Sequence, residues 1–202
     1  DCADVAGLLE LAQRFDALLL LDDAHGIGTM GEDGRGLAAA VGMSGDPRLI
    51  MTGTLGKAFG GYGAFVLAQK PLIAGLIQRM RTLIYSTALP PMLAAAALAA
   101  LHAMQRGDRL AQLRSNMRYF TKQGGGAAAS PIIPWYVGED GGDAQANIQA
   151  LAASDALEAQ GLRVVAIRPP TVPKGGARLR ITLSARHTTE QLDRLLAALR
   201  SC

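Results

Sequence analysis

Two short stretches of the sequence hold side chains whose types and spacing suit catalysis. An apolar run at residues 17–21 ends in two aspartates, the first of them Asp22, and His25 follows in the same segment. Open α/β sheets bind ligands beyond the carboxyl ends of their strands, so a strand over this run would present these side chains to a ligand. Further along, Lys57 lies in the segment Thr54–Gly61, whose glycines would let its amine approach a ligand closely.

A lysine in a glycine-rich turn, with an acid on the preceding strand, fits pyridoxal 5'-phosphate (PLP) as cofactor. PLP chemistry needs a lysine amine that forms a Schiff base and a carboxylate that pairs with the pyridinium nitrogen. Lys57 is the candidate for the first role and Asp22 for the second. Adjacent strand residues point to opposite faces, so only one of Asp22 and Asp23 can reach a ligand. Either motif alone also suits a solvated strand end or a surface turn.

Two other kinds of ligand site are weaker interpretations of the same segment. Residues 26–31 match the GxGxxG pattern of dinucleotide-binding folds, which requires a helix to open at the last glycine. The next residues, 32–36 (EDGRG), favour a turn instead, so these glycines are expected to shape a loop. A metal site is not predicted, because the remaining histidines, His102 and His187, suit structural positions and no thiolate lies nearby.

Composition places the chain among globular proteins. Of its 202 residues, 50% are hydrophobic and 18% are charged, and the net charge of +3 comes from scattered basic residues, which argues against nucleic acid as a partner. No apolar run reaches the roughly 18 residues that a membrane-spanning helix needs, so no membrane partner is expected. Cys2 and Cys202 suggest no disulfide framework and favour a reducing, cytoplasmic setting. The absence of an initiator Met suggests a piece of a longer protein.

Strands and helices are expected to alternate over residues 1–95, which favours an α/β layer with a mostly parallel sheet and flanking helices. Buried strands are predicted from apolar runs, and helices from apolar residues at helical spacing. The predicted strands are residues 17–21, 49–52 and 64–68, and the predicted helices are residues 5–12, 72–83 and 92–104.

A smaller α+β domain is expected over residues 96–202. The glycines at 124–126 predict a loop, and Thr188 or Thr189 before Glu190 predicts the N-cap of a closing helix. The predicted strands are residues 132–137, 162–167 and 178–184, with a helix over about residues 144–160.

The strand predicted at 178–184 alternates cleanly between polar and apolar residues. Its polar face would carry Arg178, Arg180, Thr182 and Ser184, and its other face three aliphatic side chains. A solvated outer face would give the same pattern. Arginine also suits two-pronged recognition of a carboxylate, so a substrate-binding role is the alternative that we favour.

Four motifs in this order and spacing resemble those of the α-oxoamine synthases, which are PLP enzymes of fold-type I. The resemblance covers nearly the whole chain, is weakest over residues 119–146, and implies the C-terminal half of such an enzyme: part of the PLP-binding large domain and a small α+β domain. The motifs are Asp22–Gly26 (DDAHG), Gly34–Gly36 (GRG), Thr54–Gly60 (TLGKAFG) and Tyr85–Thr87 (YST).

The resemblance implies a role for each residue that matches the family's cofactor site. Lys57 would carry PLP, Asp22 would pair with the pyridinium nitrogen, and His25 would bind the ring oxygen by a hydrogen bond. Thr54 would contact the phosphate.

Substrate and subunit contacts are implied in the same way. Ser86 and Thr87 would lie near the cofactor of a neighbouring subunit, which implies a homodimer with shared active sites. Arg180 matches the arginine that binds the amino-acid carboxylate, and Thr171 resembles a substrate-contacting threonine. Arg168, held in extended conformations by the following proline, would help to select the acyl substrate.

Two segments are similar to the biotin-pathway member of the family: Leu83–Thr87 (LIYST) and Ala166–Pro173 (AIRPPTVP). This implies decarboxylative condensation of L-alanine with a pimeloyl thioester, carried by coenzyme A or a carrier protein. Two alternatives stay open. The chain could have a sister activity of the glycine C-acetyltransferase, 5-aminolevulinate synthase or serine palmitoyltransferase type, or it could be an inactive fragment or interaction module.

Overall fold

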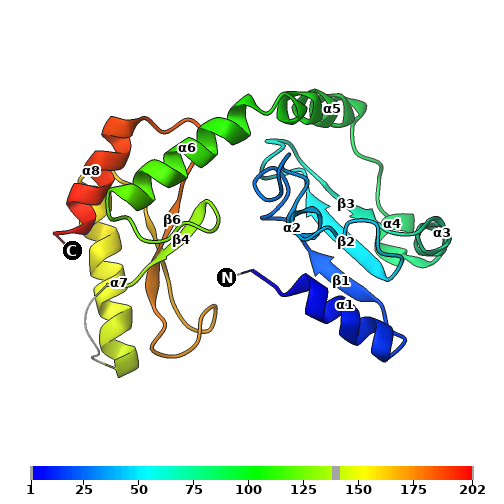
Figure 1. Cartoon of the computed structure of the whole chain (residues 1–202), viewed down its shortest axis with the longest axis horizontal. Coiled ribbons are helices and arrows are strands. Elements are labelled where there is room, and N and C mark those ends of the chain that lie inside the picture. The colour runs from blue at the N-terminus through cyan, green and yellow to red at the C-terminus, as the bar shows by residue number, and fades with distance from the viewer. Residues whose placement is uncertain (1, 138–141, 202) are drawn as a thin grey trace. The chain divides into compact units, whose positions relative to one another are not determined.

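The computed structural model describes residues 2–137 and 142–201, which form two compact units (Figure 1). The units comprise residues 1–110 and 111–202, whereas the sequence placed the change of domain at residues 95–96. Helix α5 (Pro91–Gln105) belongs to the first unit, where the sulfur of Met104 lies close to Gly28.

A three-stranded sheet forms the centre of the first unit, in the order β1-β2-β3. The strands are β1 (Leu19–Asp22), β2 (Leu49–Thr54) and β3 (Ala64–Leu67), close to the predicted positions. β1 and β2 pair in parallel, but β2 and β3 pair antiparallel, so the described sheet is mixed rather than mostly parallel. Residues 55–63 are too few for the crossover that a parallel neighbour would need, which is typically a dozen residues or more.

The core of the first unit is small and lies between α1 (Val5–Arg14), the sheet and α2 (Leu37–Ala40). Apolar residues at helical spacing place one face of α1 against the sheet, and the side chain of Asp4 caps the helix by accepting the N–H of Gly7 at 3.1 Å. The buried members are Val5, Leu9, Leu21, Ala38 and Leu49.

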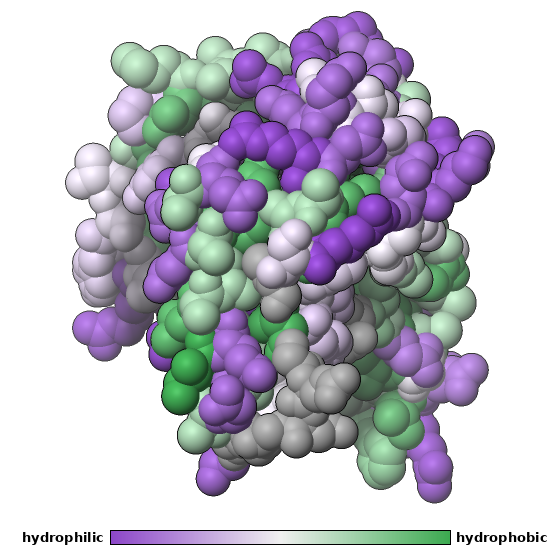
Figure 2. Space-filling view, turned by 90° about the vertical axis from the view of Figure 1, so that its left-hand side faces the viewer, coloured by the Kyte–Doolittle hydropathy of each residue, from purple (hydrophilic) through white to green (hydrophobic). Residues whose placement is uncertain are grey.

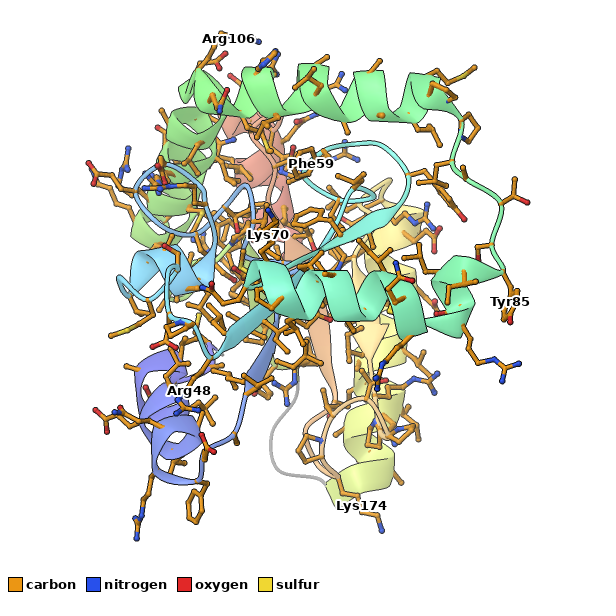
Figure 3. The ribbon with its side chains drawn as sticks, turned by 90° about the vertical axis from the view of Figure 1, so that its right-hand side faces the viewer. Arg48, Phe59, Lys70, Tyr85, Arg106 and Lys174 are labelled. Carbon is orange, nitrogen blue, oxygen red and sulfur yellow. The ribbon has the colours of Figure 1, made fainter. Side chains whose placement is uncertain are left out.

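Three further helices of the first unit are apolar yet exposed: α3 (Lys70–Arg79), α4 (Arg81–Ile84) and α5. All of their residues are described, and none is buried. The sequence predicted a single helix over 72–83, whereas Met80 is extended and separates α3 from α4. Figure 3 shows Tyr85, 78% exposed, at the outer edge of the segment that follows α4. The exposed apolar side chains here include Ile77, Leu83, Ile84, Leu89, Met92, Leu98 and Leu101.

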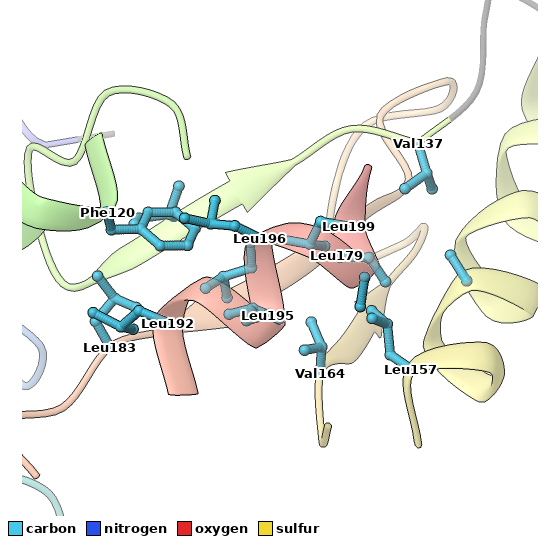
Figure 4. Packing of buried hydrophobic residues seen from close by; sticks show 14 of the residues in the cluster. Phe120, Val137, Leu157, Val164, Leu179, Leu183, Leu192, Leu195, Leu196 and Leu199 are labelled. Carbon is cyan, nitrogen blue, oxygen red and sulfur yellow. The ribbon is translucent and has the colours of Figure 1, made fainter. Parts of the chain in front are cut away.

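The second unit is an antiparallel sheet in the order β4-β6-β5, with helices packed on one face. Its strands are β4 (Ile132–Trp135), β5 (Val165–Ile167) and β6 (Arg178–Thr182), and its helices are α6 (Asp108–Lys122), α7 (Gly142–Ala159) and α8 (Thr189–Leu199). Leu179 and Ile181 of β6 point into a core that also holds Phe120, Leu157 and Leu192 (Figure 4). The predicted α+β arrangement is therefore present.

The outer side of the second unit is polar and apolar by turns. Figure 2 shows hydrophilic and hydrophobic residues intermixed on the face that carries α7 and α8.

Inside the second unit, the buried Asn116 of α6 donates to the carbonyls of Ser184 at 2.8 Å and His187 at 2.9 Å, and so ties α6 to the turn after β6. No helix among the described residues is both long and apolar enough to cross a membrane.

A capping box starts α8. The hydroxyl of Thr188 accepts the N–H of Gln191 at 3.3 Å, and the Gln191 side chain accepts the N–H of Thr188 at 3.1 Å. Of the two threonines that the sequence offered, Thr188 is the cap.

Replacing the cap should weaken the second unit measurably. We expect Thr188→Ala to lower the free energy of unfolding by about 1 kcal/mol, because the N–H of Gln191 at the start of α8 loses its acceptor, the hydroxyl of Thr188. The matched control is Thr189→Ala, which leaves the capping box intact and should change stability much less. Chemical denaturation followed by circular dichroism measures both, and equal losses would contradict the assignment of the cap.

Candidate active site

The parallel pairing of β1 with β2 brings the two candidate segments to one edge of the sheet. Asp22 lies opposite Thr52 in the register, and β2 ends two residues later at Thr54. Across this edge the amine nitrogen Nζ of Lys57 lies 3.0 Å from Nε2 of His25. Both side chains are exposed, so a ligand at this edge can reach them. Lysine as an ammonium ion can only donate, which assigns Nε2 as the acceptor and Nδ1 as the protonated nitrogen in that state.

The turn that carries Lys57 is held by its own hydrogen bonds. The N–H of Leu55 donates to the carbonyl of Gly63 at 2.9 Å, and the N–H of Gly61 donates to the carbonyl of Leu55 at 2.7 Å. Within this loop the N–H of Gly60, at a φ of +62°, donates to the carbonyl of Lys57 at 2.9 Å. Lys57 therefore begins a tight turn, and the left-handed conformation explains a glycine at position 60.

The hydroxyl group of Thr54 forms two hydrogen bonds within the same loop. Its oxygen accepts the N–H of Gly56 at 3.0 Å and donates to the carbonyl of Gly63 at 3.3 Å. A phosphate contact by Thr54 would have to replace the longer of these two bonds.

The two adjacent aspartates lie in opposite environments, as the alternation of strand residues predicts. Asp22 is exposed, and its carboxylate accepts the N–H of Ala24 at 3.0 Å. Asp23 is only 3% exposed, on the same side of the strand as buried Leu21. Asp22 is therefore the one of the two that a ligand can reach.

Burial changes the acidity of Asp23. Loss of solvent raises the pKa of its carboxyl group above the ordinary value, and the nearby charge of Asp22 adds to this rise. The N–H of Leu37, which donates to Oδ2 at 2.7 Å, and the nearby backbone N–H groups of Gly26 and Ala38 oppose this rise in pKa. No role for Asp23 was predicted from the sequence. The signal that points to it is period-two alternation, which extends the buried face of β1 to this acid.

The GxGxxG stretch is a loop, as predicted. Gly28 and Gly31 have φ values of +82° and +77°, and no helix opens at Gly31, because α2 begins only at Leu37. The hydroxyl of Thr29 donates to the carbonyl of His25 at 2.8 Å. The loop thus shapes the segment that presents His25.

Ser86 and Thr87 lie away from the buried part of the first unit. Both are exposed in the segment after α4, and the hydroxyl of Ser86 donates to the carbonyl of Thr82.

The two arginines of β6 differ in what they contact. Arg178 is already engaged, since its Nε donates to the carbonyl of Gly176 at 2.6 Å and its guanidinium lies 4.7 Å from the centre of the Tyr136 ring. Arg180, between Pro134 and Val165 in the register, has a buried Nε with no hydrogen-bond partner among the residues that the structure describes. Its position is thus suited to an acceptor that the described residues do not supply.

The remaining substrate candidates lie on a turn of the second unit. Arg168 and Thr171 are exposed, and the N–H of Thr171 donates to the carbonyl of Arg168 at 3.1 Å across the cis peptide bond between Pro169 and Pro170.

Neither of the other two histidines belongs to the segments that hold His25 and Lys57. Nδ1 of His187 accepts the N–H of Ser184 at 3.2 Å, which gives it a structural role, and His102 is exposed on α5. Within residues 2–137 and 142–201, no group of three or more potential ligands is placed to hold a metal ion.

The sequence is similar to a known family over almost its full length. A family model described as "Aminotransferase class I and II" matches residues 1–199. Among curated relatives, 8-amino-7-oxononanoate synthase of Hydrogenovibrio crunogenus is 44% identical, and the match covers 100% of this chain and 51% of that protein. The synthase of the same name from Marinobacter nauticus is 48% identical, with 97% and 50% covered. The chain spans about half the length of these relatives.

Several solved structures also resemble this chain. 8-amino-7-oxononanoate synthase from Francisella tularensis is 31% identical, with a TM-score of 0.78 over 96% of this chain and 57% of that one. Serine palmitoyltransferase of Sphingomonas wittichii is 30% identical, with a TM-score of 0.85 over 100% and 51%. The serine palmitoyltransferase of S. paucimobilis, with bound PLP-myriocin aldimine, is 27% identical, with a TM-score of 0.86 over 100% and 51%.

Proposed function

The chain belongs to the aminotransferase class I and II family, and we propose that it is part of a PLP-dependent acyltransferase of biotin biosynthesis. The reaction would condense L-alanine with a pimeloyl thioester to give 8-amino-7-oxononanoate, carbon dioxide and the free thiol of coenzyme A or a carrier protein. The observation that carries the PLP chemistry is the contact of Lys57 with His25 beside Asp22. The choice of reaction rests on the name shared by relatives of 44% and 48% identity.

The donor set at the sheet edge fits PLP. Lys57 offers a primary amine on an exposed turn, Asp22 an exposed carboxylate for the pyridinium nitrogen, and His25 an imidazole for the ring oxygen. The fit of Thr54 to the phosphate is looser, because its hydroxyl already bonds Gly56 and Gly63. When bound, PLP supplies an electron sink for the negative charge that develops at the α-carbon of the amino acid.

Lys57 and His25 are the residues placed to move protons. The Lys57 amine can take the α-proton of L-alanine and later return a proton to the α-carbon of the product. Its 3.0 Å contact with Nε2 of His25 fixes where that amine lies. Asp22 is exposed at the end of β1, and its carboxylate would keep the pyridinium nitrogen protonated.

The substrates carry two carboxylates, and two arginines suit them. Arg180 has a buried Nε without a hydrogen-bond partner in the described part of the chain, which favours it for the carboxylate of L-alanine. Arg168 and Thr171 lie on an exposed turn, where Arg168 would select the acyl donor and Thr171 would contact substrate. Sister enzymes of the family would share Lys57 but would transfer another acyl group, so the preferred acyl donor distinguishes the proposed activity from a sister activity.

We also propose a homodimer with shared active sites. The exposed, apolar helices α3, α4 and α5 support an interface, and Ser86 and Thr87 follow directly on α4. A cytoplasmic, reducing setting is proposed as well, in keeping with the free thiol of Cys2. Cys202 lies outside the described residues.

Borohydride reduction of the full-length protein loaded with PLP should fix the pyridoxyl group on Lys57, because that amine lies 3.0 Å from His25 at the proposed cofactor site. Peptide mapping by mass spectrometry locates the label. The Lys57→Ala variant should take up no stable label, whereas Lys70→Ala, at the start of α3, should label as the wild type does. A label on Lys70, Lys122 or Lys174 would overturn the cofactor assignment.

The arginines should separate the two substrates. Arg180→Ala should weaken L-alanine binding by roughly tenfold to a hundredfold, or about 1.5 to 3 kcal/mol, as expected for one lost charged hydrogen-bonded pair. Arg168→Ala should act mainly on kcat/KM for pimeloyl over acetyl and palmitoyl thioesters. Spectral titration with L-alanine and a panel of thioesters measure these effects.

Arg178→Ala is the matched control for the L-alanine titration, because Tyr136 and Gly176 already occupy that guanidinium. A loss of L-alanine affinity as large as that of Arg180→Ala would show that position along β6, rather than an unpaired Nε, decides binding. A donor preference for acetyl or palmitoyl thioesters would favour a sister activity.

Shared active sites can be tested by mixing two defective full-length variants. Lys57→Ala subunits and Ser86→Ala/Thr87→Ala subunits should each be poorly active, and their mixture should recover about a quarter of wild-type activity. About half of randomly paired dimers are hybrids, and each hybrid keeps one intact site if Ser86 and Thr87 serve the neighbouring subunit. A mixture no more active than the mean of its parents would show that each site uses one subunit only.

A further inference from the structure

The carboxylate of Asp23 is a buried polar group next to the proposed site, with the residue only 3% exposed. Its Oδ2 accepts the N–H of Leu37 at 2.7 Å. Asp23 directly follows β1, and Leu37 is the first residue of α2. The side chain therefore joins both ends of the loop at residues 24–36.

Two glycines leave the space that this carboxylate fills. A Cβ at Gly26 would collide with Oδ1 of Asp23 and lie 3.1 Å from the nitrogen of Leu37. A Cβ at Gly36 would collide with Oδ2, and Gly36 has a φ of +102° besides. The carboxylate thus lies against backbone on two sides, beside Gly26 and Gly36, where it accepts the N–H of Leu37.

The same residue closes the turn that presents His25. The main-chain carbonyl of Asp23 accepts the N–H groups of Gly26 at 3.0 Å and Ile27 at 3.1 Å. His25 lies inside this turn, and its imidazole meets the Lys57 amine at 3.0 Å. The position of Nε2 therefore depends on a turn that Asp23 holds through both its main chain and its side chain.

We propose that Asp23 is a positioning residue for the reaction: its carboxylate fastens the 24–36 loop and so sets the distance between His25 and Lys57. This rests on the proposed function for its kinetic part alone. A helix cap needs one acceptor oxygen and tolerates Asn. In Asp23, Oδ2 accepts the N–H of Leu37 and Oδ1 packs beside Gly26, so Asn can keep the Leu37 bond only if its NH2 group, with two hydrogens to place, fits the enclosed space of Oδ1. Burial raises the pKa of this carboxyl group, and the nearby backbone N–H groups, that of Leu37 first, favour the ionised form.

The first experiment measures the loop without any ligand. In the PLP-free full-length protein, Asp23→Asn should speed hydrogen exchange in peptides that cover residues 24–38 and leave those that cover residues 186–201 unchanged. Unchanged exchange at 24–38 would overturn the proposal outright. This readout does not depend on whether PLP binds, so it separates failure of the inference from failure of the proposed function.

The second experiment is a double-mutant cycle on the loaded enzyme. Asp23→Asn should lower kcat by roughly tenfold to a hundredfold with a smaller change in KM, as expected when a reacting group is displaced by about 1 Å. In the His25→Ala background the same change should lower kcat by less than about twofold, because Asp23 acts through His25. Equal losses in both backgrounds, or no loss in either, would overturn the proposal.

A glycine pair provides the check that survives poor folding of Asp23→Asn. Gly26→Ala keeps the carboxylate charged but pushes it off its donors, so it should reproduce both the faster exchange and the loss of kcat. Gly45→Ala is the matched control, since a Cβ there meets nothing within 4 Å. If Gly26→Ala behaves like Gly45→Ala, the carboxylate does not position the loop.

Discussion

The parallel register of β1 with β2 is the constraint on which the rest of the site depends. Because Asp22 lies opposite Thr52, the segments that follow both strands leave the sheet on the same edge, and Lys57 can meet His25 at 3.0 Å although 32 positions separate them. A slip of one residue would exchange the faces of Asp22 and Asp23, putting the exposed acid in the core and the bonded one in solvent. The register thus decides which acid is available to a ligand as well as where the lysine lies.

The two adjacent acids illustrate how one strand can serve both chemistry and structure. Ionising a carboxyl group in a buried place is unfavourable unless hydrogen bonds compensate, and the carboxylate of Asp23 accepts the N–H of Leu37 at 2.7 Å. Asp22, one residue earlier, is exposed to solvent, and its carboxylate accepts the N–H of nearby Ala24. In the loop after β1, Asp23 is therefore bonded and buried, while Asp22 and His25 are exposed. This arrangement limits how far His25 can move.

Local patterns predicted much of this fold, and the misses share a cause. The apolar runs before Asp22 and over 49–52 are strands, and Thr188 starts the last helix, because burial and capping are encoded within a few residues. The antiparallel return of β3 and the extended Met80 that interrupts the helix predicted at 72–83 depend on contacts or loop length that no short window contains. The bonding of Asp23 was missed for the same reason: its donor Leu37 is 14 residues away.

The arginines of β6 show where pattern alone stops being informative about function. Arg178 and Arg180 occupy equivalent positions in an alternating strand, and nothing in their local sequence ranks one above the other. Their surroundings do, because Arg178 already contacts the Tyr136 ring and bonds a carbonyl through its Nε, while the buried Nε of Arg180 has no partner among the described residues. A buried donor left unpaired is unfavourable by about 1 to 3 kcal/mol. A ligand carboxylate that supplied the missing acceptor would recover that energy on binding, so the unpaired Nε is a reason to expect more affinity at Arg180 than at Arg178.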